Sequence, residues 1–474
     1  MSYLDFEDYD EEPLDSTKGQ KSYSDSEMSQ LLEAARKGEL NLETIDELAV
    51  YHYDHGNFDT ALKFLEVLTE FSPFSSDVWE RKGMVLNNLG HYHQALESFE
   101  HAESLNPYDV ELLLNKGITL DNLGRSSEAM GCFEHVLAIE PENEEARFSQ
   151  GIVHERKGDY QIAIDIFKTL IDRNPAHKDA WYELGYCYDF TDRLPEALGC
   201  YDRYLAMSPF NASAWYNRGI VLNRLGWYRK AVESYDIALA IQEDFGSVWY
   251  NRGNSCANLK WMDEAIVCYQ KTLELEPDDE MAWHNLGNAY EELTQYPDAI
   301  RCFTEALALE PDHYESLYGR GSVYDAMDDL EHAYEDYRAA VGLAPEVAEV
   351  WYALADVEYS LGKIDDSLAS YRRVVDLEPA NGEAWLDFAE TLYESGRTLE
   401  AMEAVQESLR LDQKWADAYA LLARLAFLLR RRSVAMEALR TVMERFPNVR
   451  AQITAEFPII RTHADFSSYR THSA

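Results

Sequence analysis

The sequence is short of positive charge. It contains 42 lysine and arginine residues against 87 aspartate and glutamate residues, which gives a formal net charge of -45 over 474 residues. A protein that binds a nucleic-acid backbone needs a basic surface that displaces counterions, and an anionic membrane surface attracts the same kind of residue. The shortage of basic residues therefore argues against nucleic acid as a partner and disfavours binding to a membrane surface.

Long apolar runs are also missing. The longest, residues 418–429, is interrupted by Arg424 and falls well short of the roughly 20 residues that span a bilayer. The first ten residues have neither the basic start nor the apolar run of a secretory signal. We therefore expect no direct membrane insertion and a cytoplasmic location.

Motifs for metal binding and catalysis are lacking as well. The six cysteines form neither a Cys-x-x-Cys motif nor a mixed cysteine and histidine cluster at ligand spacing. A phosphate-binding glycine loop, a His-Glu-x-x-His helix and a nucleophile elbow are all absent. We expect a non-catalytic protein without cofactor or metal. Four cysteines share one place in the repeat described next, which favours a role as small buried apolar residues: Cys132, Cys200, Cys268 and Cys302.

The sequence has instead a period of 34 residues, which runs from residue 42 to residue 449. Glycine or alanine stands at the eighth place of each repeat, alanine at the twentieth place of nearly all, and proline at the thirty-second place of most. Seven tryptophans share the fourth place: Trp79, Trp181, Trp215, Trp249, Trp283, Trp351 and Trp385. Twelve repeats follow without insertion, and they begin at residues 42, 76, 110, 144, 178, 212, 246, 280, 314, 348, 382 and 416.

Each repeat is predicted to form two antiparallel helices. Trp215, Gly219 and Leu222 recur at i, i+4 and i+7, which places them on one face of a helix. Gly226 suits the tight turn that follows, and proline near the end of the repeat stops the second helix. Because a single hairpin cannot bury its own apolar face, the repeats must stack. The predicted fold is an all-α solenoid.

This pattern resembles the tetratricopeptide repeat (TPR) family. The resemblance is carried by residues 282–290, AWHNLGNAY, and by the residues that follow them in the same repeat, Tyr296, Ala299, Phe303, Ala306 and Pro311. It implies an α-solenoid superhelix of twelve tandem helix-turn-helix repeats that binds other proteins. In this family the first helix of each repeat lines the concave face, where ligands usually bind.

The ends of the chain depart from the repeat. Residues 1–27 mix acidic, aromatic and serine residues without helical periodicity, so we predict a disordered acidic N-terminal tail, with a short binding motif as the alternative. Residues 28–41 are expected to form an N-terminal helix and linker before the TPR superhelix of residues 42–449. Residues 450–474 are assigned to a C-terminal capping helix and tail, with Ile453 and Phe457 on the apolar side of the cap.

Polar and aromatic side chains follow the first helices of the middle repeats. Asparagine offers a donor and an acceptor and can hold the backbone of an extended peptide, while tyrosine adds apolar area with a polar tip. The alternative is that these are typical repeat residues without a dedicated ligand. The candidate peptide-binding residues stand at the fifth, sixth and ninth places: Tyr182, Tyr216, Asn217, Tyr250, Asn251, Asn254, His284, Asn285, Asn288 and Tyr318.

The charge of this surface indicates the character of the partner. The fifth, sixth, ninth, twelfth and thirteenth places together hold 15 acidic residues against four arginines. The leading hypothesis is a scaffold or adaptor that binds an extended or basic peptide segment of another protein in its concave groove. Two alternatives stay open: a structural protein that self-associates through its apolar C-terminal repeat, and a regulatory subunit of an enzyme complex.

Overall fold

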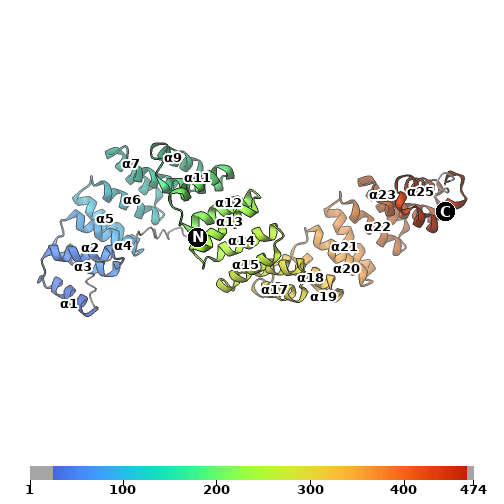
Figure 1. The fold of residues 1–474 in the computed structure, drawn as a ribbon, viewed down its shortest axis with the longest axis horizontal. Helices are drawn as coiled ribbons and strands as arrows, with labels where there is room; N and C mark the ends of the chain where they lie inside the picture. The colour runs from blue at the N-terminus through green and yellow to red at the C-terminus, as the bar shows by residue number, and fades with distance from the viewer. Residues whose placement is uncertain (1–24, 467–474) are drawn as a thin grey trace. The chain divides into compact units, whose positions relative to one another are not determined.

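The computed structural model describes residues 25–466. These residues form helices and short connections, and the described range contains no β-strand. The chain divides into two compact units, which meet at residues 210 and 211 and are described separately. Within each unit, consecutive helices pack in antiparallel pairs (Figure 1). The predicted all-α solenoid is confirmed.

The N-terminal unit contains the first eleven helices in the described range. They are α1 (Asp25–Arg36), α2 (Leu42–Asp54), α3 (Phe58–Phe71), α4 (Ser76–Asn88), α5 (Tyr92–Leu105), α6 (Val110–Asn122), α7 (Ser126–Ile139), α8 (Glu144–Arg156), α9 (Tyr160–Arg173), α10 (Lys178–Phe190) and α11 (Leu194–Met207).

The C-terminal unit contains the remaining helices and a short 3-10 turn. They are α12 (Ala212–Arg224), α13 (Tyr228–Ile241), α14 (Gly246–Asn258), α15 (Met262–Leu275), α16 (Glu280–Glu292), α17 (Tyr296–Leu309), α18 (Tyr314–Ala326), α19 (Leu330–Leu343), α20 (Ala348–Ser360), α21 (Ile364–Leu377), α22 (Gly382–Glu394), α23 (Thr398–Leu411), α24 (Ala416–Leu428), α25 (Arg432–Arg445), η1 (Pro447–Val449), α26 (Arg450–Glu456) and α27 (Ile459–Thr462).

The turn inside each repeat depends on one residue with a left-handed backbone. This residue is glycine in most repeats, for example Gly90 and Gly226, both with φ of 73°. Glycine adopts this conformation at little cost because it has no Cβ. Other residue types take the same φ in five repeats: Asp192, Lys260, Thr294, Asp328 and Arg430. Arg430, the first of three consecutive arginines, therefore serves as a turn residue.

The glycine at the eighth place lets the two helices of a repeat approach closely. A Cβ added to Gly219 would lie 2.3 Å from Cε1 of Tyr235, a ring that is fully buried on α13. Gly287 stands in the same relation to Phe303, where the distance would be 2.8 Å. Because protein interiors are close-packed, neither ring has free space to move into.

In six repeats the tryptophan at the fourth place bonds to the loop before its helix. Nε1 of Trp283 donates a hydrogen bond to the carbonyl oxygen of Pro277 at 3.1 Å, and Trp351 bonds Pro345 at 3.0 Å. Trp249 makes the same bond to Glu243 at 2.9 Å, although glutamate replaces the proline there. This hydrogen bond explains why tryptophan follows proline by six residues in these repeats.

The two ends differ in detail from the prediction. Helix α1 begins at Asp25, three residues before the predicted start at Met28, because the apolar pattern marks the buried face of the helix and not its first turn. The rest of the predicted disordered tail, residues 1–24, lies outside the described residues. In the described range, no helix combines the length and the apolar character needed to cross a membrane.

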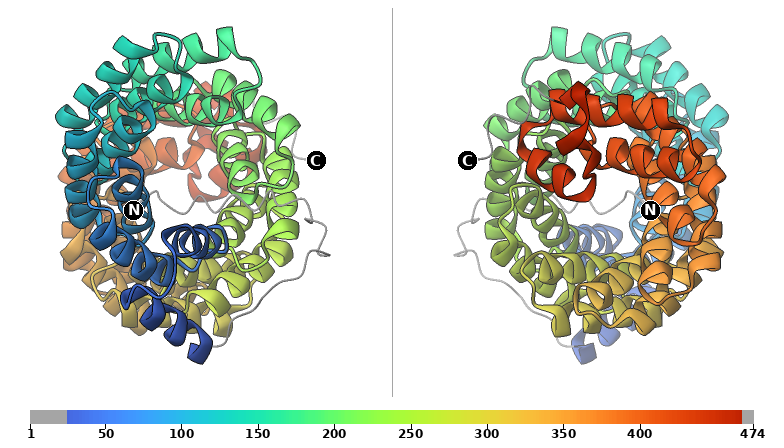
Figure 2. Two further views of the ribbon diagram at one scale, coloured as in Figure 1. Left: turned by 90° about the vertical axis from the view of Figure 1, so that its left-hand side faces the viewer. Right: turned by 90° about the vertical axis from the view of Figure 1, so that its right-hand side faces the viewer.

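At the other end, the chain covers its own last repeat. Ile453, Phe457, Ile460 and Phe466 are buried in one apolar cluster with α24 and α25. The red segment that carries them is visible against the final helix pair in Figure 2. The unusually apolar face of the last repeat is therefore occupied within the molecule, which removes the observation that favoured self-association through it.

Candidate peptide-binding face

Nine of the ten predicted site residues lie in the C-terminal unit. They belong to the first helices of four consecutive repeats, α12, α14, α16 and α18. Tyr182 is the exception, since it lies on α10 in the N-terminal unit. Its side chain is only 8% exposed and packs against Tyr204, with the ring centroids 5.2 Å apart. We therefore build the site from the residues of the C-terminal unit alone.

The asparagines at the sixth place connect neighbouring repeats. Nδ2 of Asn251 donates to the hydroxyl oxygen of Tyr216 at 3.1 Å, and Nδ2 of Asn285 donates to that of Tyr250 at 3.0 Å. Each tyrosine thus accepts a bond from the asparagine 35 residues later. We call this series the tyrosine–asparagine relay. Its first role is structural, because it joins one first helix to the next.

The ninth place supports a buried tyrosine of the second helix. Oδ1 of Asn254 accepts a hydrogen bond from the hydroxyl of Tyr269 at 2.8 Å and a second from Nδ2 of Asn285 at 3.3 Å. Tyr269 is almost fully buried, so its hydroxyl needs this partner. One repeat earlier, Ile220 occupies the ninth place, and the buried hydroxyl of Tyr235 has no hydrogen-bond partner in the described part of the chain.

This unpaired hydroxyl gives a direct prediction. Tyr235→Phe is expected to raise the free energy of unfolding by about 1 kcal/mol, because it removes a buried polar group that makes no bond. Tyr269→Phe is the matched control. It removes the donor that bonds to Oδ1 of Asn254, so it should lower the free energy of unfolding. Urea unfolding followed by circular dichroism measures both. Equal effects of the two substitutions would contradict this interpretation.

His284 replaces tyrosine at the fifth place and is neutral. Its Nδ1 lies 2.9 Å from Oγ of Ser316, and its Nε2 accepts a hydrogen bond from Nδ2 of Asn288 at 2.9 Å. Burial, with a smaller contribution from the nearby His313, lowers the pKa of His284 to about 4. The imidazole therefore adds no positive charge to this face near neutral pH.

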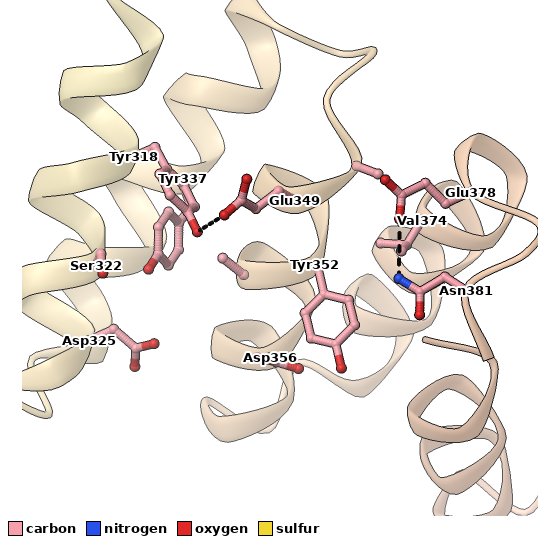
Figure 3. A pocket seen from close by; sticks show the side chains of 12 residues that line it. Tyr318, Ser322, Asp325, Tyr337, Glu349, Tyr352, Asp356, Val374, Glu378 and Asn381 are labelled. Carbon is pink, nitrogen blue, oxygen red and sulfur yellow. Dashed lines mark hydrogen bonds between the residues drawn. The ribbon is translucent and has the colours of Figure 1, made fainter. Parts of the chain in front are cut away.

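The relay stops where the sixth place loses its asparagine. Gly319 and then Ala353 stand there, so no amide reaches Tyr318, whose hydroxyl donates instead to Oε1 of Glu349 at 3.1 Å. A cavity of about 470 Å³ opens at this point, between α18 and α20 (Figure 3). Its lining includes Tyr318, Ser322, Asp325, Tyr337, Glu349, Tyr352, Ala353, Asp356 and Glu378.

The cavity is strongly negative. Four carboxylates line it, and none of the described residues that line it carries a positive charge. Burial raises the pKa of Asp356 to about 6, and the neighbouring Asp387 adds to the rise, while a hydrogen bond from Tyr371 opposes it. Burial also raises the pKa of Asp325, with a contribution from Asp328. A cation placed here would relieve the repulsion among these groups.

A metal ion is not the cation that the geometry favours. Within residues 25–466, no three carboxylate, histidine or cysteine side chains converge closely enough to hold one. Tyr318 and Tyr352 instead offer ring surface beside the carboxylates, as Figure 3 shows. Aromatic rings and carboxylates together suit an organic cation, such as the side chain of lysine or arginine.

Sequence reasoning identified the relay residues but not the cavity. The sequence does mark the position of the cavity. Asparagine fills the sixth place at Asn217, Asn251 and Asn285, and the next two repeats have Gly319 and Ala353 there. A small residue in a series of larger ones leaves space that only a structure can locate.

Comparisons of the sequence with family models match most of the repeat region. Models of the tetratricopeptide repeat match residues 76–109 and, in overlapping stretches, residues 114–168, 148–198 and 188–244. The model of the cilia and flagella-associated protein 70 C-terminal domain matches residues 243–452. No curated protein sequence matches the chain.

Several solved structures are similar to parts of the chain. YrrB, described as a TPR protein with an unusual peptide-binding site, is 19% identical, with a TM-score of 0.36, and the match covers 42% of this chain and 99% of YrrB. For the Cut9–Hcn1 hetero-tetramer of APC/C the identity is 14%, the TM-score 0.43 and the coverage 85% and 99%. The C-terminal part of a TPR repeat-containing protein of Cytophaga hutchinsonii is 20% identical, with a TM-score of 0.44, and the match covers 50% of this chain and 97% of that part.

Proposed function

Because the chain belongs to the tetratricopeptide repeat family, whose repeats form protein-interaction scaffolds, we propose that it binds an extended, basic segment of another protein. The segment would lie along α14, α16, α18 and α20 and place a lysine or arginine side chain in the cavity beside Tyr318 and Tyr352. We retain the cytoplasmic location predicted from the sequence as part of this proposal.

The observation that carries the proposal is the cavity itself. It combines four carboxylates with three tyrosine side chains at the point where the relay is interrupted. Coulomb attraction between a cation and these carboxylates is stronger at a partly enclosed site than in bulk water. The interruption also distinguishes this site from the repeats of Tyr216 and Tyr250, where an asparagine amide bonds to the tyrosine hydroxyl.

The relay contributes a second kind of contact. The bonds that Asn251 and Asn285 make within the described residues use their amide nitrogens, which leaves their carbonyl oxygens to accept from peptide N–H groups. Such bonds hold a peptide backbone whatever its sequence. Affinity for an extended backbone would then come from the relay, and preference for a basic residue from the cavity.

A single substitution tests the role of the cavity. In Ala353→Asn, the new amide is positioned to reach the Tyr318 hydroxyl as Asn285 reaches that of Tyr250, and its side chain occupies the cavity. We expect the preference for peptides with lysine or arginine over peptides with glutamate to fall about tenfold, or about 1.4 kcal/mol. Panning a library of ten-residue peptides against the full chain measures this preference.

Ala369→Asn is the matched control, because Ala369 is exposed on the second helix α21. It should leave the peptide preference unchanged. Association of the basic peptides with the unmodified chain should also slow as salt is added, since screening weakens electrostatic steering. An unmodified chain without preference for basic peptides, or an Ala353→Asn variant that keeps it, would contradict the proposal.

The comparisons suggest where to look for the partner. The match to the C-terminal domain of cilia and flagella-associated protein 70 spans all the residues that line the cavity. Basic segments of proteins from cilia and flagella are therefore the first candidates to test in the same assay.

A further inference from the structure

Two cysteines of one repeat lie beside the same arginine. Nη1 of Arg252 on α14 is 2.9 Å from Sγ of Cys268 on α15 and 4.0 Å from Sγ of Cys256 on α14. Both sulfur atoms thus lie within 4.0 Å of one guanidinium nitrogen, and each thiol shifts the pKa of the other. The helices are very close here, since a Cβ added to Gly253 would lie 3.1 Å from Cβ of Cys268.

The surroundings favour ionisation of one thiol of the pair. The pKa of Cys268 is lowered to about 7, mainly by the hydrogen bond from Cys256 and then by the positive charge of Arg252. Asp236 holds the guanidinium in place at 2.7 Å and opposes part of this effect, and Glu264 faces Cys256. A thiolate at Cys268 is thus paired with a neutral thiol at Cys256, the arrangement of an attacking and a resolving cysteine.

One neighbour of the pair also lines a cavity. Both sulfur atoms are buried, but Arg252 also lines a cavity of about 650 Å³, together with Asp236, Trp249 and Val267. Arg252 therefore contacts both this cavity and the thiols, and we infer that a small oxidant reaches them from the cavity when this side chain moves.

We propose that Cys256 and Cys268 form a redox site that a hydroperoxide oxidises to an intramolecular disulfide. The Cys268 thiolate attacks one oxygen of hydrogen peroxide, which gives a sulfenic acid and releases hydroxide. The Cys256 thiol then attacks the sulfenic sulfur, the disulfide forms, and water leaves with the proton of Cys256. Two thiols and one peroxide yield one disulfide and two waters, and the peroxide accepts both electrons.

The chain contains its own control pair. Cys187 on α10 and Cys200 on α11 are also both buried, one on each helix of a pair in the N-terminal unit. Cys187 faces a carboxylate in place of a guanidinium, since its Sγ lies 3.6 Å from Oε2 of Glu155. Burial raises the pKa of Cys200 to about 12 and raises that of Cys187 as well, so neither thiol ionises near neutral pH.

The test treats the full chain with hydrogen peroxide at pH 7 and follows thiol alkylation by mass spectrometry. Trypsin cleaves after Arg252, Lys260 and Lys271, so a disulfide would link the peptides 253–260 and 261–271. We expect this linked product to form first, while Cys187, Cys200 and Cys302 stay available for alkylation. Loss of Cys187 or Cys302 at the same rate, or oxidation of Cys268 without the link, would overturn the proposal.

Two variants test the role of the arginine. Arg252→Gln should slow formation of the linked product roughly fivefold. Loss of the positive charge raises the pKa of Cys268 and so lowers its thiolate fraction, and the greater nucleophilicity of the remaining thiolate offsets only part of this loss. Arg252→Lys, which keeps the charge, should restore most of the rate. Circular dichroism establishes that both variants are folded. If a variant does not fold, the comparison among the cysteines of the unmodified chain still tests the proposal. If the folded variants form the linked product at the same rate as the unmodified chain, Arg252 does not activate Cys268.

Discussion

Replacing Gly219 with alanine is expected to lower the free energy of unfolding by up to about 2 kcal/mol. The added methyl group would lie 2.3 Å from the Tyr235 ring, which is fully buried, so one of the two helices must shift. Overpacking of this kind costs about 1–3 kcal/mol, and more where the neighbour is held on all sides. The gain in helix propensity, about 1 kcal/mol, offsets only part of this loss. Urea unfolding followed by circular dichroism measures the difference.

Gly199→Ala is the matched control for this substitution. Gly199 lies in the middle of α11, is exposed, and has no atom within 4 Å of an added Cβ. The same chemical change should therefore stabilise the chain by up to about 1 kcal/mol through helix propensity alone. If both substitutions stabilise, the close approach of the helices in the C-terminal unit is not what selects glycine at the eighth place.

Raising the pH from 5 to 8 is expected to destabilise the N-terminal unit through a pair of buried carboxyl groups. Glu155 on α8 and Glu183 on α10 share a hydrogen bond, and Glu183 is only 9% exposed. Burial raises the pKa of Glu155 to about 7, and burial together with Glu155 raises the pKa of Glu183. The folded state therefore holds a proton that the unfolded state, with a glutamate pKa near 4.3, has released.

This difference in proton binding means that the stability of the unit falls as the pH rises. The stabilisation is fully present below about pH 4.5 and is lost as the pH rises through about 7, where the folded pair must ionise. Glu183→Gln removes the second charge but keeps the shape, so it should flatten this slope and stabilise the unit by about 2 kcal/mol at pH 8. Hydrogen exchange measured on peptides from α8 to α10 reports the effect locally.

Glu134→Gln is the control for this prediction. Glu134 is exposed on α7, so its substitution changes the net charge by the same amount without touching the pair. It should leave the pH dependence of exchange in α8 and α10 unaltered. A slope that is equally flat in both variants would assign the effect to the general negative charge of the chain.

The regularity of the repeat made most of the fold predictable. Small residues at the eighth place, glycine in the turn and proline at the end each have one physical explanation, and they agree through consecutive repeats. The positions without glycine in the turn, such as Lys260 and Arg430, were harder to interpret. In the structure they adopt the same left-handed conformation because the packed helices on both sides impose it.

The site was less accessible to sequence reasoning than the fold. Asn251 and Asn285 were predicted to contact a peptide, and the structure shows that their amide nitrogens bond to tyrosines of the preceding repeat. Partners 35 residues apart are invisible in a pattern with a period of 34 unless the geometry of stacking is known. The proximity of Cys256 to Cys268, and of Glu155 to Glu183, depends on the same packing and could not be derived from spacing.

The hydrogen bond from a fourth-place tryptophan indole to a carbonyl six residues earlier limits how such a chain can change in length. Loss of a single residue between Pro277 and Trp283 would break that bond and shift every later side chain around the helix axis. Removal of the 34 residues 244–277 instead joins equivalent points, because Glu243 would then stand six residues before Trp283, in the relation that it now has to Trp249. Insertions and deletions in the repeat region that keep this bond are therefore whole repeats of 34 residues.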